Sequence, residues 1–118
     1  MNKKIVYSCS GCSSAAQMAN WIAVEMDRQG VAEMSCISGV GGGVKSMVQK
    51  AQAADVLIGI DGCALRCVEA CLRREGMACT YHFDLNEFGI KKKIHQDFDR
   101  QKAKETFVHI VRKIGNLV

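Results

Sequence analysis

The chain alternates short apolar runs with stretches of helical periodicity, and this alternation most constrains its fold. The apolar runs have the length and β-branched content of buried strands, and they cover residues 4–8, 31–37, 56–60 and 79–84. Apolar residues recur at helical spacing in the stretches between and after them, at residues 15–26, 44–54, 64–75 and about 97–117. Such alternation predicts a parallel sheet with helices on both faces, joined by right-handed crossovers. We therefore predict a three-layer α/β fold, flavodoxin- or Rossmann-like, with a mainly parallel four-stranded sheet in the order 2-1-3-4.

Length and cysteine usage indicate what kind of protein this is. The 118 residues predict a single α/β domain over 1–118 with its own hydrophobic core. No apolar run approaches the ~18 residues of a membrane span, and the N-terminus lacks the pattern of a signal peptide. Seven cysteines are an odd number, so a disulfide framework is not indicated. We expect a cytoplasmic protein whose thiols serve metal or redox chemistry, with no membrane partner.

The charge pattern argues against nucleic acid as a partner. The net charge is +4, and the basic residues gather late in the chain, where acidic residues are interleaved with them. A groove for nucleic acid combines a basic stripe with aromatic side chains for stacking, whereas aromatic residues make up only 6% of this chain. The late basic residues are therefore interpreted as the solvated face of a helix.

The stretch from Asp61 to Cys67 carries the clearest chemical signal. Asp61 and Gly62 end the apolar run at 56–60, and we expect Cys63 where the chain turns into a helix. Cys67 would then lie one helical turn further, on the same face. A helix N-terminus favours negative charge, so both thiols would ionise more readily there. Asp61 is expected to cap this helix or, as the alternative, to tune the nearby sulfurs.

The predicted topology brings four cysteines to one edge of the sheet. Cys9, Cys36 and Cys63 each follow a predicted strand, so they fall at the carboxyl ends, where open α/β sheets bind ligands. Cys67 would reach back toward them from its helix. Four converging sulfurs suit tetrahedral zinc or, alternatively, an iron–sulfur cluster. No Ser/His/Asp set or paired carboxylates suggest an ordinary hydrolytic enzyme.

Four short motifs occur in order along this part of the chain. They are Cys9-Ser10-Gly11, Met34 to Gly42, Ile60 to Cys67 and Phe88-Gly89-Ile90-Lys91-Lys92. Together they resemble the DGC domain family, which is named for its Asp-Gly-Cys motif, over about residues 5–93. The resemblance implies a zinc-binding protein whose four chelating cysteines are Cys9, Cys36, Cys63 and Cys67. Those are the four cysteines that the predicted sheet brings to one edge.

The remaining cysteines and a histidine have weaker assignments. Cys12 forms a Cys-x-x-Cys pair with Cys9, a spacing shared with redox dithiols, so it is a candidate extra thiol. Cys71 is a second extra thiol but borders an apolar helix stripe, and Cys79 opens the fourth strand at the opposite edge, which indicates a structural role. His82, near the carboxyl end of that strand, is a lesser ligand candidate.

Two functional hypotheses follow. The first is a binding module that holds zinc through four thiolates. The second is a redox or sulfur-relay protein in which Cys9, Cys12 or Cys63 reacts or an iron–sulfur cluster is held. Residues 39–43, rich in glycine, are expected to form a flexible turn that gives Cys36 room.

Overall fold

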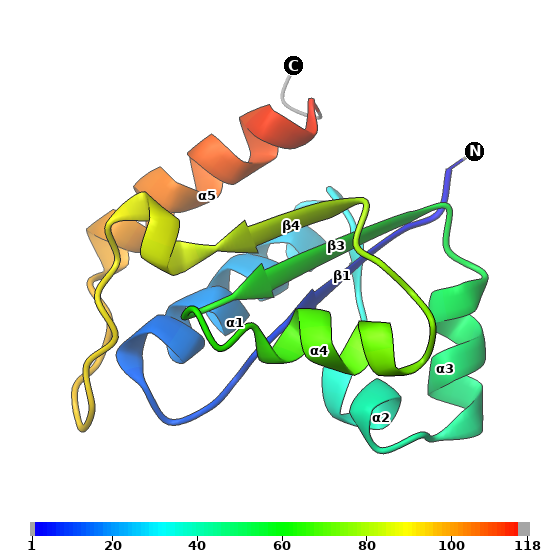
Figure 1. Ribbon diagram of the computed structural model, residues 1–118. Helices are drawn as coiled ribbons and strands as arrows, with labels where there is room; N and C mark the ends of the chain where they lie inside the picture. The colour runs from blue at the N-terminus through cyan, green and yellow to red at the C-terminus, as the bar shows by residue number, and fades with distance from the viewer. Residues whose placement is uncertain (1, 116–118) are drawn as a thin grey trace.

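The computed structural model describes residues 2–115, which form a four-stranded sheet with helices on both faces (Figure 1). The strands are β1 (Lys4–Ser8), β2 (Glu33–Met34), β3 (Val56–Asp61) and β4 (Tyr81–Asp84). Their order is β2-β1-β3-β4, and every neighbouring pair is parallel. Both the predicted fold class and the predicted strand order are confirmed.

The strand register aligns the carboxyl ends of the central strands. β1 pairs with β3 from Lys4 opposite Val56 to Ser8 opposite Ile60. The ladder continues one residue further, since the Cys9 amide donates to the Ile60 carbonyl at 3.2 Å. On the other side of β3, Asp61 lies opposite Asp84. Cys9, Asp61 and Asp84 therefore lie side by side at the carboxyl ends of three adjacent strands, with Cys9 directly after β1.

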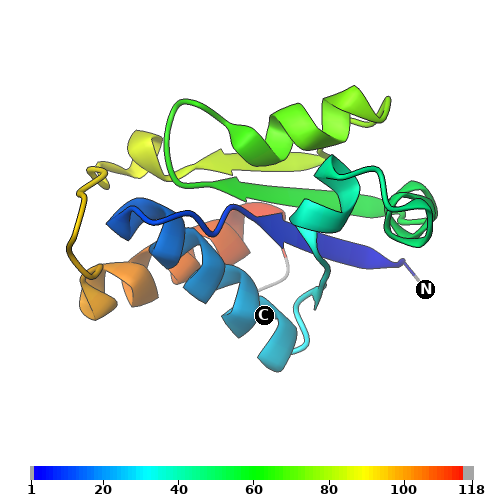
Figure 2. The ribbon, with the colours of Figure 1, turned by 90° about the horizontal axis from the view of Figure 1, so that it is seen from below.

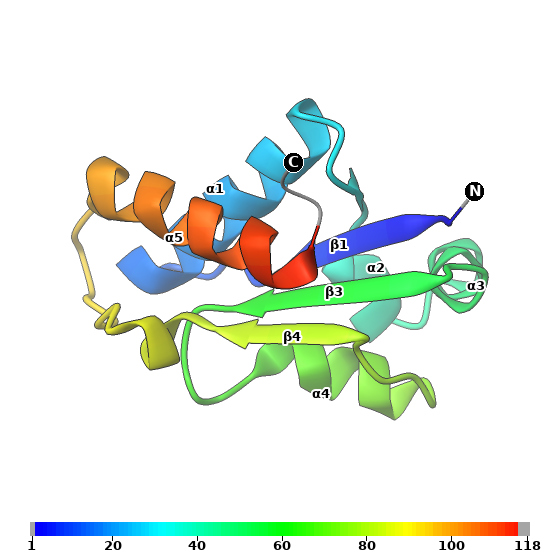
Figure 3. The same ribbon diagram turned by 90° about the horizontal axis from the view of Figure 1, so that it is seen from above.

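The helices divide between the two faces of the sheet, as the views from below and above show (Figures 2 and 3). α1 (Ser14–Arg28) and α5 (Arg100–Ile114) cover one face. α2 (Ile37–Gly41), α3 (Lys45–Gln52) and α4 (Cys67–Arg74) cover the other. A short 3-10 helix, η1 (Leu85–Phe88), follows β4 directly.

Successive side chains of β1 point to opposite faces of the sheet, so this strand contributes to the hydrophobic core on both faces. Val6 faces α1 and α5 and packs with residues such as Ile22 and Ile110. Ile5 and Tyr7 face the opposite way and pack with α2, α3 and α4. Because all of β1 from Ile5 to Ser8 is buried, this central strand is covered on both sides, as expected for a parallel sheet between two helical layers.

The segment between α1 and α3 differs most from the sequence-based expectation. The strand expected over 31–37 is reduced to Glu33–Met34, and most of the glycine-rich turn is the helix α2. Its glycines serve close packing: a Cβ on Gly39 would lie 2.6 Å from Met47 Cγ, and one on Gly41 would lie 2.8 Å from Cys71 Sγ. Glycine therefore allows α2 to approach both α3 and α4.

Other boundaries shift by a few residues. β4 begins at Tyr81 rather than at Cys79, and η1 occupies part of the loop expected after it. α5 begins at Arg100 because the carboxylate of Asp99 accepts the amide of Lys102 at 3.1 Å and caps it. Leu117, expected on the apolar face of this last helix, lies outside the described residues. Among those residues, no helix has the length and apolar character needed to cross a membrane.

Candidate thiol site at the carboxyl edge of the sheet

Three of the predicted site residues follow strands at the same edge. Cys9 comes directly after β1, Cys36 comes two residues after β2, and Cys63 comes two residues after β3. Cys67 is the first residue of α4. The parallel sheet thus brings the carboxyl-end cysteines to one edge, as the topology argument predicted.

Gly62 links three segments at this edge. Its amide donates a hydrogen bond to Cys9 Sγ at 3.1 Å. On its other side, a Cβ would lie 2.7 Å from the backbone carbonyl carbon of Ala15 and from the backbone nitrogen of Ala16, in the first turn of α1. Backbone atoms cannot move aside as a flexible side chain can. The glycine of the Asp-Gly-Cys sequence is therefore required for the turn to pack against α1.

The helix after this turn begins later than the sequence suggested. We expected a helix from residue 64 with Cys63 and Cys67 one turn apart on one face, but α4 starts at Cys67. Cys63 to Arg66 form a separate turn, closed by a 3.1 Å hydrogen bond from the Arg66 amide to the Cys63 carbonyl. Arg66 has φ 53°, a left-handed conformation that no helix interior accepts. Cys63 therefore lies in the turn and Cys67 begins the helix, so the two cysteines do not share a helix face.

Asp61 explains where the helix starts. Its carboxylate accepts the amides of Val68 at 2.8 Å and Glu69 at 3.2 Å, in the first turn of α4. Those amides have no partner within the helix, and a carboxylate is also favoured at this end of the helix dipole. The predicted capping role of Asp61 is confirmed, although the capping residue lies outside the helix and seven residues before Val68.

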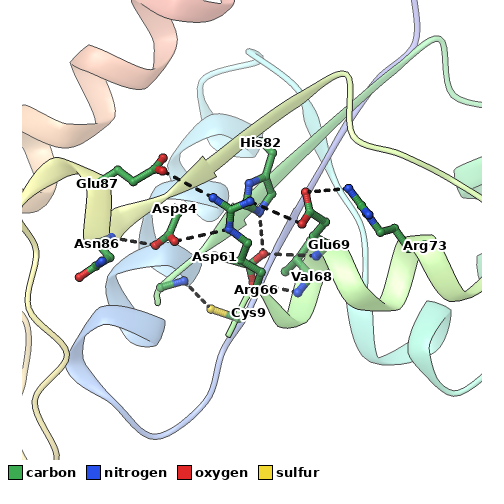
Figure 4. A network of polar contacts seen from close by, with 11 residues as sticks. Cys9, Asp61, Arg66, Val68, Glu69, Arg73, His82, Asp84, Asn86 and Glu87 are labelled. Carbon is green, nitrogen blue, oxygen red and sulfur yellow. Dashed lines mark hydrogen bonds and ion pairs between the residues drawn. The ribbon is translucent and has the colours of Figure 1, made fainter. Parts of the chain in front are cut away.

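His82 completes the surroundings of Asp61. Its Nε2 lies 2.8 Å from Asp61 Oδ2, and both side chains are largely buried. Figure 4 shows the imidazole and the α4 amides meeting at this one carboxylate. His82, considered as a metal ligand from the sequence, therefore has its Nε2 engaged with Asp61.

Arg66 connects the turn to the end of β4. Its guanidinium lies 3.6 Å from the buried carboxylate of Asp84 and 3.5 Å from Glu87 in η1 (Figure 4). It also lies 3.6 Å from Glu69 on α4. These ion pairs hold the turn containing Cys63 between β4 and α4. The sequence analysis did not assign this role to Arg66. The available signal was the position of this charged residue between Cys63 and Cys67 in the motif.

Electrostatics couple three of the four predicted ligands. Burial raises the pKa of Cys9 to about 11, the Gly62 amide lowers it, and the negative charges of Asp61, Cys67 and Cys63 raise it again. The sulfurs of Cys63 and Cys67 therefore lie within electrostatic reach of the Cys9 sulfur. A bound cation would reverse this balance and favour their thiolates.

Cys36 has a different environment. It is exposed, and its sulfur lies 3.0 Å from the hydroxyl of Ser38. This contact and the Gly39 backbone amide lower the pKa of Cys36. The groups that influence Cys36 thus belong to α2, whereas those that influence Cys9 belong to the Asp-Gly-Cys turn and α4.

The remaining thiols are distributed around the site. Cys12 is exposed in the loop before α1, while Cys71 packs on Gly41 and Cys79 packs on Gly59. Burial raises the pKa of Cys71, and it raises that of Cys79 to about 11. These contacts agree with a packing role for Cys71 and Cys79.

The donor types suit zinc, because thiolates are preferred ligands of that metal. Across residues 2–115, however, no three Cys, His, Asp or Glu side chains are grouped closely enough to hold a metal ion. The ligand set Cys9, Cys36, Cys63 and Cys67 therefore stays a prediction. Within it, Cys9, Cys63 and Cys67 share one neighbourhood.

Comparison with known proteins agrees with the motifs. Residues 5–110 match the DGC domain, so the match extends beyond the motifs into α5. The chain is also 45% identical over 108 residues to the anaerobic and virulence modulator AnvM of Pseudomonas aeruginosa, covering 92% of this chain and 82% of that protein. No solved structure matches the chain. The extent of both matches shows that this chain belongs to the DGC domain family.

Proposed function

We propose that this protein binds zinc through cysteine thiolates at the carboxyl edge of its sheet. Cys9, Cys63 and Cys67 are the ligands with the strongest support, and Cys36 is the fourth ligand that the sequence predicts. The observation that carries the proposal is the surroundings of Cys9. Its sulfur accepts the Gly62 amide at 3.1 Å, and its pKa responds to the charges of Cys63 and Cys67. A cation held by Cys9, Cys63 and Cys67 together would favour their thiolate forms.

The raised pKa of Cys9 fits such a site. Without a metal, its thiol stays protonated near neutral pH, because its pKa is about 11. Zinc binds the thiolate, so metal binding would release protons and would become stronger as pH rises. With four thiolates the site would be closed and structural, whereas three would leave a position for another ligand. The metal would tie the end of β1 to the turn after β3.

A redox or sulfur-relay role is the second candidate. The similar protein from Pseudomonas aeruginosa is named an anaerobic modulator, and thiols and iron–sulfur clusters both respond to oxygen. Cys9, Cys12 and Cys63 would then be the reactive thiols, or the same edge would hold a cluster. Cys12 is exposed and lies three residues after Cys9, at the spacing of redox dithiols, which favours this candidate over an enzyme of hydrolytic type.

Metal content and colour separate the two candidates. We expect protein purified without oxygen under reducing conditions to be colourless and to hold about one zinc per chain. Inductively coupled plasma mass spectrometry and a visible absorption spectrum of the same sample measure both properties. A brown protein with iron and visible bands would contradict zinc and favour a cluster. Cys36→Ser then tests the fourth ligand, because a closed four-thiolate site would lose affinity on that change.

A further inference from the structure

A cavity of about 260 Å³ lies where α1 and α5 begin, beside the segment 89–99 that joins η1 to α5 (Figures 1 and 3). This is the carboxyl edge of the sheet, since α1 follows β1 and η1 follows β4. Gly89, Ile90 and Lys91 line the cavity, and all three belong to the motif Phe88-Gly89-Ile90-Lys91-Lys92. The proposed zinc site uses no residue of this motif.

Hydrogen bonds hold the segment 89–99 against the start of α1. The Ser14 amide donates to the Lys93 carbonyl at 2.8 Å, and the Lys93 amide donates to Ser14 Oγ at 3.0 Å. At the other end of the segment, Asp99 caps α5 by accepting the Lys102 amide at 3.1 Å. The backbone around the cavity is therefore in place before a ligand binds, as at most small-molecule sites.

Part of the cavity lining is apolar. Met18 and Ile90 are buried and belong to the hydrophobic core between the sheet, α1 and α5. Phe98 packs against the same core, with its ring centroid 6.3 Å from that of Trp21. An apolar group in the cavity would displace water from these side chains, which favours binding.

The charged part of the lining favours an anion. Lys91, Lys93 and Lys102 line the cavity, and in the described part of the chain no carboxylate lies within 4.0 Å of their ammonium groups. Asp97 and Asp99 line it as well, so three lysines and two aspartates leave one net positive charge. A monoanion balances this charge, whereas a phosphate dianion would exceed it and be repelled by the two aspartates.

We propose that this cavity binds a small carboxylic acid that carries an apolar group. The carboxylate pairs with the lysine ammonium groups, and the apolar group lies against Met18, Ile90 and Phe98. The cavity is smaller than the sites of about 300–1,000 Å³ that hold drug-sized ligands, which limits the ligand to about one ring. Binding is noncovalent and involves no thiol, so this inference goes beyond the proposed zinc function.

The test is a titration with phenylacetate, which has one carboxylate and one ring. Nitrogen-15-labelled protein, isolated under reducing conditions, is followed by nuclear magnetic resonance. The amide signals of Gly89, Lys91 and Lys93 should shift in a saturable way with a dissociation constant of about 1 mM or below. The signals of Cys63 and Cys67 should stay in place. Acetate lacks the ring and 2-phenylethanol lacks the charge, so each should bind about tenfold or more weakly.

Two double variants with the same change in net charge make the assignment specific. Lys91→Gln with Lys93→Gln removes two lysines that line the cavity, and it should weaken phenylacetate binding by about tenfold or more. Lys92→Gln with Lys104→Gln is the matched control, because both residues are exposed and neither lines the cavity. It should change binding by less than about twofold. Circular dichroism checks that both variants are folded.

Other results would overturn the inference. Unmoved signals at Gly89, Lys91 and Lys93 would show that the cavity does not bind the acid, and equal weakening in both double variants would indicate general attraction to a basic surface. Shifts confined to Cys63 and Cys67 would place the carboxylate at the thiol site. Tighter binding of inorganic phosphate than of phenylacetate would contradict the choice of a carboxylic acid. Zinc content is measured separately, so a protein without zinc would contradict only the proposed function.

Discussion

At the scale of single residues, Asp61 joins the sheet to the helix that carries Cys67. It is 1% exposed, ends β3, caps α4 through two amides and meets His82. One buried carboxylate thus fixes the start of α4 relative to both β3 and β4. The position of Cys67 depends on this contact rather than on the cysteine itself.

Replacement of Asp61 by Asn should therefore destabilise the protein. An amide has only one acceptor oxygen for three donors, and hydrogen bonds to a charged group contribute about 1.5–3 kcal/mol each. We expect Asp61→Asn to lower the free energy of unfolding by about 2–3 kcal/mol in urea titrations. The exposed Asp55→Asn is the matched control and should change it by less than about 0.5 kcal/mol. Equal effects of the two changes would show that Asp61 does not fix α4.

The buried thiols predict a dependence on alkaline pH. Burial raises the pKa of Cys79 from 9.0 to about 11 in the folded protein. The folded state therefore keeps a proton that the unfolded state loses, and stability falls as pH rises through this range. Below pH 9 both states are protonated, and the contribution of Cys79 is constant.

This effect can be isolated with one variant. We expect the free energy of unfolding of metal-free wild-type protein to fall more steeply between about pH 9 and 11 than that of Cys79→Ala. The difference between the two proteins at each pH removes the contribution of lysines, which titrate in the same range. A constant difference across this range would show that the Cys79 pKa is the same in both states.

At the scale of elements, the turn after β3 and the first turn of α1 form one junction. Gly62 contacts the backbone of Ala15 and Ala16 on one side and Cys9 Sγ on the other. The loop after β1 and the loop after β3 are thereby held together without any metal. The junction positions Cys9 before a ligand arrives.

Gly62→Ala tests this junction. The added methyl group would lie 2.7 Å from backbone atoms, so we expect a loss of about 1–3 kcal/mol in the free energy of unfolding, the usual cost of overpacking. Gly11→Ala is the control, because its nearest contact at 3.8 Å is ordinary van der Waals distance. Thermal and urea unfolding measure both. A Gly62→Ala protein as stable as Gly11→Ala would show that the close approach is not needed.

The elements also show which parts of the structure were predictable. The parallel sheet followed from the alternation of apolar runs and helical stretches, which is a local pattern, and right-handed crossovers left few strand orders to choose from. The start of α4 did not, because it is set by the carboxylate of Asp61 and the left-handed Arg66. The helix α2 was also missed, since its glycines look like a flexible turn until Met47 and Cys71 are packed against them. Both errors arise from backbone conformation and side-chain contacts that the periodicity of apolar residues does not show.

At the scale of the whole molecule, the candidate site lies at the edge of a fold with its own core. Two layers of apolar side chains cover the faces of the sheet, whereas Cys63 and Cys67 lie in or next to an exposed loop. The topology of the sheet was sufficient to place the carboxyl-end cysteines at one edge. Their coordination of a metal cannot be read from topology, because it depends on side-chain positions within the loops.

This separation of core and site predicts that the protein folds without its metal. A metal site formed only in the folded state still adds its binding free energy to stability. We therefore expect metal-free protein to be folded but less stable than metal-bound protein, unlike a zinc finger. Cys63→Ser should behave in the same way, whereas Cys79→Ser should retain the metal because Cys79 lies at the opposite edge of the sheet.

The central claim, a thiolate metal site at the carboxyl edge, is tested most directly by zinc content in these two variants. Both are purified side by side under reducing conditions, and zinc per chain is measured together with circular dichroism. We predict that Cys63→Ser is folded and free of zinc, while Cys79→Ser holds about one zinc per chain, as a protein with one closed site does. A Cys63→Ser protein that keeps its full zinc content would contradict the account.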